Sequence, residues 1–292
     1  NSEPMNHSIV ESSGGVTLVG GGPVSAALLR LALARAPRLV GADGGADRIL
    51  ALGHEPEAVV GDLDSITPAA RARLAGRLFP LTEQVTTDFD KALRSIQAPF
   101  VLAVGFAGAR MDHGLAVLTG LVAHPDRVCL LLGPQDVVFL APPRMVLDLT
   151  PGDRLSLYPM ARVTGRSQGL EWPIDGLTFA PDGMIGTSNR VTAPEVEVEM
   201  DAPSMLAILP RNRLDAVLRA LRSASRWPAR PSANPVRPPR PKSPGACRHF
   251  GVKGPILSLL DHCSLVKKPV AERGRRLGSA HSFGGHEIES AS

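Results

Sequence analysis

The chain has 292 residues, of which 43% are apolar and 4% aromatic, and its formal net charge is +4. This composition supports one large domain or two ordinary domains with a sizeable core, and no stretch approaches the roughly 18 apolar residues that a membrane helix needs. From Pro228 onward there are 11 basic and 4 acidic residues, which leaves 21 basic and 24 acidic residues in the rest. This mildly acidic body, without a basic stripe, argues against a nucleic-acid-binding protein.

The first half of the chain alternates short apolar runs with segments rich in helix formers. Strands are predicted at 16–19, 38–43, 57–62, 100–106 and 127–133, and helices at 25–36, from 68 onward, at 87–96 and at 112–123. Strands that alternate with helices indicate a doubly wound, mostly parallel sheet that is covered on both faces. Ligands of such a sheet bind beyond the carboxyl ends of its strands.

The pattern changes near residue 142, where short segments separated by turns replace the helices. The run EVEVEM alternates as a half-buried strand does, and a helical period returns only at 211–224. We therefore expect an α/β domain at 15–141 and a smaller antiparallel β domain at 142–227. The alternative is a single mixed domain, but the abrupt loss of helices argues against it.

The two ends of the chain carry little sign of structure. Residues 1–14 are interpreted as an extension without a signal peptide, because no basic region precedes a long apolar run. Residues 228–292 are rich in proline and arginine and predict a disordered tail; a tail that binds an anionic surface is the alternative. Cys129, Cys247 and Cys263 fit neither a disulfide framework nor a zinc site, so we expect a cytoplasmic protein.

Acidic residues follow several of the predicted strands. Asp43 comes after RLVGA, and Asp62 and Asp64 come after AVVG. Asp88 lies in TTDFD and Asp112 in GARMDH. Loops that follow parallel strands open at one edge, where converging carboxylates would be costly without a positive partner. Mg²⁺ prefers oxygen ligands and shares them with phosphates, so the sequence predicts a magnesium site at this edge.

Each of these aspartates also has a simpler interpretation when it is taken alone. Asp43 would cap a turn, Asp64 would N-cap the following helix, and Asp90 would pair with Arg94 four residues later. The metal interpretation depends on the group as a whole and on the edge that its members share.

Two glycine-bearing loops between a strand and a helix are candidate phosphate-binding elements. The loop GGGPVS, with Gly21 and Gly22, would place bare amides at the positive end of a helix; a plain tight turn is the alternative, since neither the dinucleotide fingerprint nor a Walker A loop is present. The loop GFAGARMDH brings Arg110, which would clamp a phosphate or remain a surface charge. His113 would contact a phosphate or nucleobase, or cap the helix.

Four motifs in order, ADGGADRIL, GDLDSI, TTDFDKAL and GARMDH, resemble the thiamine pyrophosphokinase (thiamine diphosphokinase) family. A fifth motif, GTSN, lies in the second half and is preceded by GLEWPI. The resemblance runs from about Val16 to about Leu209. It implies an α/β ATP-binding catalytic domain, a β-sandwich thiamine-binding domain, and a homodimer with active sites at the subunit interface. The implied reaction is the Mg²⁺-dependent transfer of diphosphate from ATP to the thiamine hydroxyl, with release of AMP.

The resemblance also implies roles for individual residues. Asp62, Asp64 and Asp88 would hold Mg²⁺, with Asp43 beside them in the catalytic group. Acceptance of the proton of the thiamine hydroxyl is the alternative role of Asp88. The residues implied to contact ATP or its phosphates are Gln84, Thr87, Arg110, Asp112 and His113. Gly21 and Gly22 complete the candidate phosphate-binding set on the loop argument given above. The residues implied to hold thiamine are Trp172, Ser188 and Asn189; for Trp172, packing in the β-domain core is the alternative.

The chain departs from the family pattern at two places. Val85 and Thr86 stand where the family often has a charged residue before TD, and GARMDH has alanine where a second glycine is common. Two other functions remain open at this point: a related phosphotransferase that acts on another small alcohol, and a nucleic-acid-binding protein argued from the basic tail. The pocket residues of the β domain discriminate the first, and the acidic body weakens the second.

Overall fold

The structure, a computed structural model, describes residues 8–83, 85–108 and 110–230. Half of the predicted N-terminal extension (residues 1–7) therefore lies outside the described residues. So do Gln84 and all but the first three residues of the predicted tail.

A mixed sheet of ten strands runs through both halves of the described chain. Its strands, in spatial order, are β14 (Gly186–Arg190), β11 (Arg154–Pro159), β16 (Met205–Pro210), β9 (Asp136–Leu140), β8 (Cys129–Leu132), β7 (Val101–Val104), β2 (Val16–Val19), β3 (Arg38–Ala42), β4 (Ala58–Gly61) and β5 (Leu78–Pro80). In this spatial order, neighbouring strands pair antiparallel from β14 as far as β8. From β8 to the other edge, at β5, neighbouring strands pair parallel.

The parallel strands form where the sequence has uninterrupted apolar runs. All four residues of β2, β4, β7 and β8 are buried, as expected for strands covered on both faces. Successive side chains point to opposite faces, so Leu18 belongs to one apolar cluster and Val19 to the other.

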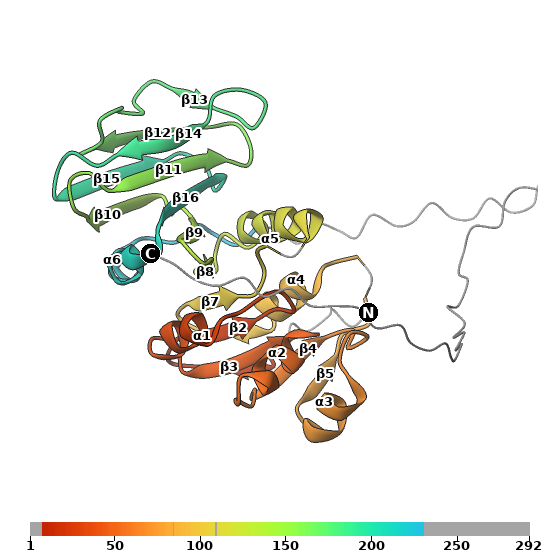
Figure 1. Cartoon of the computed structure of the whole chain (residues 1–292). Helices are drawn as coiled ribbons and strands as arrows, with labels where there is room; N and C mark the ends of the chain where they lie inside the picture. The colour runs from red at the N-terminus through yellow and green to blue at the C-terminus, as the bar shows by residue number, and fades with distance from the viewer. Residues whose placement is uncertain (1–7, 84, 109, 231–292) are drawn as a thin grey trace, which may run out of the picture. The chain divides into compact units, whose positions relative to one another are not determined.

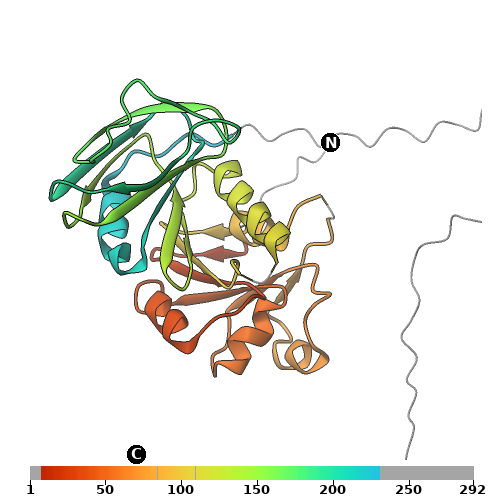
Figure 2. The same cartoon turned by 45° about the horizontal axis from the view of Figure 1, so that its top comes forward.

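Helices cover both faces of this parallel part. They are α1 (Ala26–Leu33), α2 (Gly45–Ala51), α3 (Pro68–Arg73), α4 (Asp88–Arg94) and α5 (Met111–Ala123). Buried residues of α1 and α2 pack with Val19, whereas those of α4 and α5 pack with Leu18 on the other face. Figures 1 and 2 show α1 to α5 around the parallel strands. The doubly wound α/β class is therefore confirmed.

The second half forms the predicted antiparallel β-sandwich. A sheet of four strands contains β10 (Arg144–Asp148), β15 (Glu195–Met200), β12 (Val163–Gln168) and β13 (Thr178–Phe179). Its buried side chains share one core cluster with those of β11 and β16. The EVEVEM run is β15, and its three apolar residues are buried while its glutamates are not. The short helix η1 (Arg211–Arg213) leads into α6 (Leu214–Ser223), which packs on β10.

Several features of the fold were not predicted. No helix was expected between residues 43 and 57, yet Gly45–Ala51 form α2. A short parallel pair joins β1 (Val10–Glu11), inside the expected extension, to β6 (Ile96–Gln97). The edge strand β5 has only three residues and is largely exposed. The ten-stranded sheet also crosses the expected domain boundary at residues 141–142, because β9 pairs with β8 on one side and with β16 on the other. Among the described residues, no helix is both long and apolar enough to span a membrane.

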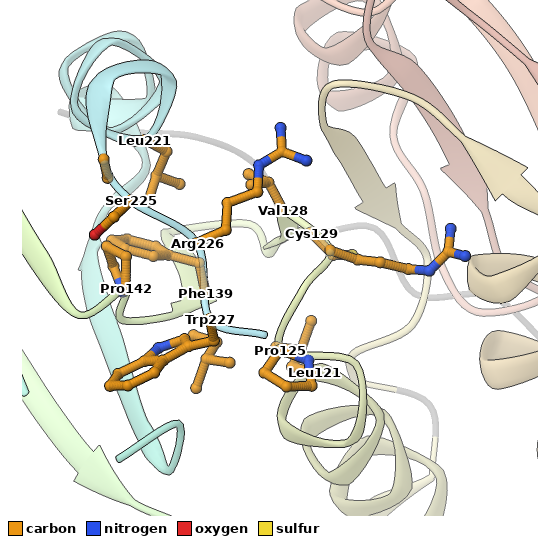
Figure 3. A pocket seen from close by; sticks show the side chains of 13 residues that line it. Leu121, Pro125, Val128, Cys129, Phe139, Pro142, Leu221, Ser225, Arg226 and Trp227 are labelled. Atoms are coloured by element: carbon orange, nitrogen blue, oxygen red, sulfur yellow. The ribbon is translucent and has the colours of Figure 1, made fainter. Parts of the chain in front are cut away.

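The segment after α6 returns to the parallel part of the sheet. Trp227 donates its indole N–H to the carbonyl oxygen of Ala141 at 2.8 Å. Figure 3 shows Trp227 among the side chains that line a pocket between this segment, β8, β9 and α5. The pocket includes Val128 and Cys129, at the amino end of β8. Ligands of a parallel sheet bind at the other end of the strands, so this pocket is not the candidate active site.

Candidate active site

The carboxylates that follow β3 and β4 meet at one edge of the sheet. One carboxylate oxygen from each of Asp43, Asp62 and Asp64 lies within 4.8 Å of the others. Backbone conformation brings them there, since Asp43 has φ 42° and Leu63 has φ 63°, both in the left-handed region. The predicted convergence of these three side chains is therefore present in the structure.

Asp88 joins the same edge from the start of α4. Gly61, at the end of β4, has φ 155°, and a Cβ placed there would lie 3.0 Å from the Asp43 Cβ and 3.2 Å from the Asp88 Oδ1. Thr87 N-caps α4 by accepting a hydrogen bond from the Asp90 amide at 3.3 Å, which places Asp88 in the first turn. We call Asp43, Asp62, Asp64 and Asp88 the acidic edge.

Asp43 is the buried member of the acidic edge. The residue is 6% exposed, and its Oδ1 has no hydrogen-bond partner among the described residues. Burial raises the pKa of Asp43, although hydrogen bonds from Ser65 and the Gly44 amide act in the opposite direction. A buried carboxylate oxygen without a partner is costly, so this atom suits a ligand that the protein itself does not supply.

The donor set fits a hard divalent cation. All of its ligand atoms are carboxylate oxygens, which Mg²⁺ prefers, and the unpartnered Asp43 oxygen is available to it. The resemblance implied Asp62, Asp64 and Asp88 as the ligands. In the structure Asp43 forms a cluster with Asp62 and Asp64, and Asp88 pairs with a lysine.

That lysine is Lys91, which sequence reasoning missed. Its Nζ lies 3.1 Å from the Asp88 Oδ1 and 3.9 Å from the Asp62 Oδ2, and its side chain is only 3% exposed. The available signal was its position three residues after Asp88, since residues spaced i and i+3 on a helix are neighbours.

The two glycine loops meet where the strand order reverses, between β2 and β7. The Gly20 amide donates to the Val104 carbonyl at 2.8 Å, and the Gly22 amide donates to the Gly105 carbonyl at 2.9 Å. A Cβ at Gly20 would lie 2.7 Å from the Gly105 oxygen, so this contact requires glycine. The Gly22 amide is thus already engaged, whereas Gly21 is exposed and its carbonyl accepts from Arg48.

Arg110 is the N-cap of α5, and the first turn of this helix, from Met111 to His113, is exposed. Arg110 donates to both carboxylate oxygens of Asp112, at 3.1 and 2.5 Å, and this guanidinium lowers the pKa of Asp112 to about 2. The His113 amide donates to the same carboxylate at 2.9 Å. Asp112 therefore pairs with Arg110, and the structure does not place it in the three-carboxylate cluster.

Of the simpler interpretations of single aspartates, the structure contradicts the one for Asp64 and confirms the one for Asp90. The N-cap of α3 is Thr67, which accepts from the Ala70 amide, so the idea that Asp64 caps this helix was wrong. Asp90 does pair with Arg94, at 3.6 Å, and it also contacts the His124 Nε2 at 2.7 Å.

The three residues implied to hold thiamine lie together in the sandwich. Asn189 is buried and forms two hydrogen bonds with the backbone of Trp172. Its Oδ1 accepts from the Trp172 amide at 3.2 Å, and its Nδ2 donates to the Trp172 carbonyl at 2.7 Å. The Trp172 residue is 56% exposed, with the Arg190 guanidinium 6.0 Å from its ring centroid. The core interpretation of Trp172 was therefore wrong. Ser188 is exposed, with φ 63°.

The acidic edge lies far along the sheet from the group formed by Trp172, Ser188 and Asn189. Asn189 belongs to β14 and Asp62 follows β4, and seven strands lie between these two. Neighbouring strands are about 4.8 Å apart, so the separation within one chain is on the order of 30–40 Å.

The fold and the acidic edge together define an α/β protein with a metal–phosphate type of site, joined to a β-sandwich. The thiamin pyrophosphokinase catalytic domain matches residues 29–130, and the vitamin B1 binding domain of the same enzyme matches residues 145–205. The chain belongs to the thiamin pyrophosphokinase family.

Individual relatives agree with this assignment. Thiamine pyrophosphokinase 2 of Oryza sativa subsp. japonica is 27% identical, over 59% of this chain and 77% of the relative. The thiamin pyrophosphokinase of Geobacillus thermodenitrificans aligns with a TM-score of 0.55 at 21% identity, over 67% of this chain and 96% of that one. The yeast enzyme aligns with a TM-score of 0.58 at 16% identity, over 73% and 91%. At these identities the two structures support the fold.

Proposed function

We propose that this protein is a Mg²⁺-dependent thiamine pyrophosphokinase that transfers diphosphate from ATP to the hydroxyl of thiamine. The bond that forms joins the thiamine hydroxyl oxygen to the β-phosphorus of ATP. The bond that breaks joins this phosphorus to the oxygen that bridges to the α-phosphorus, and AMP leaves with that oxygen. The observation that carries the proposal is the acidic edge, with an unpartnered buried oxygen, at the carboxyl ends of parallel strands.

The residues of the acidic edge would act mainly by positioning and by charge. Phosphoryl-type transfer needs in-line alignment and neutralisation of charge more than covalent help. Asp43, Asp62 and Asp64 would hold Mg²⁺, which neutralises phosphate charge when it is bound. Asp88 is hydrogen-bonded to Lys91, which favours a role in the arrangement of the edge.

The phosphates would lie over the glycine loops at the switch point between β2 and β7, where ligands of doubly wound sheets bind. Gly21, Thr87, Arg110 and His113 are all exposed. To reach a phosphate, Arg110 would use donors beyond those that now bind Asp112, because a guanidinium has five.

The thiamine site would be shared between two subunits. The exposed Trp172 ring offers a flat surface to an aromatic cation, with Asn189 holding its backbone. Because seven strands separate it from the acidic edge, one chain does not bring both to one substrate. A homodimer that apposes the sandwich of one subunit to the acidic edge of the other would do so. The spacing of the three cysteines in the sequence does not fit a disulfide framework, which supports a cytoplasmic location.

The experiment is incubation of the purified protein with ATP, Mg²⁺ and thiamine, followed by chromatography of the products. AMP and thiamine diphosphate in equal amounts are expected, with no product when EDTA is present. Formation of ADP and thiamine monophosphate would mean transfer of a single phosphate and would refute the proposal. Turnover of another small alcohol in preference to thiamine would favour the related phosphotransferase.

The shared site has its own test. Asp62→Ala and Trp172→Ala would each abolish or impair the sites of a homodimer. In mixed dimers one site carries both changes and the other carries neither, so subunit exchange should restore about a quarter of the wild-type activity. No recovery after verified exchange would argue against a site built from two subunits.

A further inference from the structure

We propose that Lys91 is a built-in countercharge that limits how tightly the acidic edge holds a divalent cation and makes the edge compatible with anionic phosphates. This inference rests on the proposed metal site. It assigns a role to a buried residue that contacts the carboxylates and that has no part of its own in the proposed reaction.

The Lys91 ammonium lies against two acids of the edge but is shielded from solvent. Its ammonium contacts Asp88 at 3.1 Å and Asp62 at 3.9 Å. The Lys91 side chain is 3% exposed, whereas the side chains of Asp62 and Asp88 are 24% and 35% exposed. The lysine therefore lies beneath the carboxylates, and solvent reaches the acids but hardly reaches the ammonium.

The Lys91 charge is buried among apolar neighbours and is paired with the acidic edge. Lys91 lies on α4 beside the buried apolar residues Phe89, Ala92 and Leu93, and a buried ammonium is tolerated only when it is paired. Its two described ionic partners are both members of the acidic edge. Among the described residues, the Lys91 ammonium therefore forms ion pairs only with the acidic edge.

The consequence is competition for the same oxygens. A cation that binds Asp62 must share a carboxylate with the ammonium, and the two positive charges repel each other. Without Lys91 the edge would carry one more uncompensated negative charge. It would then attract a bare divalent cation more strongly and repel the phosphates of ATP more strongly.

The test compares metal and nucleotide binding in two variants. Lys91→Met removes the charge but keeps a long side chain, and Lys91→Gln removes the charge but keeps a donor to Asp88. Mn²⁺ binding is measured by electron paramagnetic resonance without nucleotide, and binding of ATP with Mg²⁺ is measured by calorimetry without thiamine. Arg38→Met is the matched control, because Arg38 pairs with Glu57 at the amino end of β3, away from the edge.

We expect both Lys91 variants to bind Mn²⁺ about tenfold more tightly and ATP about tenfold more weakly, since the loss of one nearby charge acts with opposite sign on the two ligands. The control should change neither affinity. If both affinities fall together, or if neither changes in a folded variant, Lys91 has only a packing role and the inference is overturned. Should Lys91→Met fail to fold, Lys91→Gln decides. Absence of Mn²⁺ binding in the wild-type protein would instead overturn the proposed metal site.

Discussion

Neutralisation of Asp62 should stabilise the metal-free protein while it abolishes turnover. The side chain lies among like charges, with carboxylate oxygens of Asp43 and Asp64 within 4.8 Å. At this separation and an effective dielectric constant of about 20, the repulsion of Asp62 by each of the two carboxylates is about 3.5 kcal/mol. Its attraction to the Lys91 ammonium at 3.9 Å offsets about 4 kcal/mol of the total. The balance is a net repulsion of about 3 kcal/mol before solvent screening.

Solvent screening reduces this figure, because the Asp62 side chain is 24% exposed. We expect Asp62→Asn to raise the free energy of unfolding by about 1 kcal/mol in EDTA. For a chain of this size that corresponds to an increase in Tm of about 2–4 °C. In Mg²⁺ the order should reverse, since the wild-type protein gains stability from a bound cation and the variant loses a ligand for it.

The assay is urea denaturation, followed by circular dichroism, in EDTA and in Mg²⁺. Asp112→Asn is the control, because Asp112 pairs with Arg110 and its neutralisation should give no gain in EDTA. A variant Asp62→Asn that is less stable than the wild-type protein in EDTA would refute the reasoning. The reasoning would also be refuted if Mg²⁺ stabilised the Asp62→Asn variant as much as it stabilises the wild-type protein.

Three further predictions concern packing, the thiamine surface and the buried thiol. Gly45→Ala should cost about 3 kcal/mol in urea denaturation, because its Cβ would lie 2.0 Å from the Val19 carbonyl oxygen; Gly114→Ala in α5, which meets nothing within 4 Å, should not destabilise the protein. Trp172→Ala should raise the KM for thiamine about tenfold with little loss of stability, since the residue is 56% exposed; an unchanged KM would remove it from the site. Burial raises the pKa of Cys129 to about 12, so mass spectrometry should find it unmodified by iodoacetamide until the protein is unfolded, and rapid labelling of the native protein would contradict this.

The parallel strands were the part of the fold that the sequence predicted best. Strands such as β2 and β8 are buried on both faces, so each reads as an uninterrupted apolar run. The strand β5 was missed because it is short and largely exposed at the edge of the sheet. The continuity of the sheet across residues 141–142 was missed because β9 pairs with β16, about 65 residues further along the chain, and no local pattern encodes that pairing.

The acidic edge was predictable in part for a similar reason. Asp43, Asp62 and Asp64 follow strand ends, and the geometry of a parallel sheet brings such positions together. The partner of Asp88 was not found, because Lys91 in isolation looks like any charged residue of an amphipathic helix; only the packing of α4 shows that it is buried. The bonds between Asn189 and Trp172 join residues 17 apart, which the spacing alone does not indicate.

The most direct test of the central claim is a crystal structure of the protein with Mn²⁺ and ATP, with the cation located by its anomalous scattering. We expect an anomalous peak bound by carboxylate oxygens of Asp43, Asp62 and Asp64, in contact with the phosphates of the nucleotide. A nucleotide bound elsewhere, or an acidic edge that holds no cation while ATP is bound, would contradict the account.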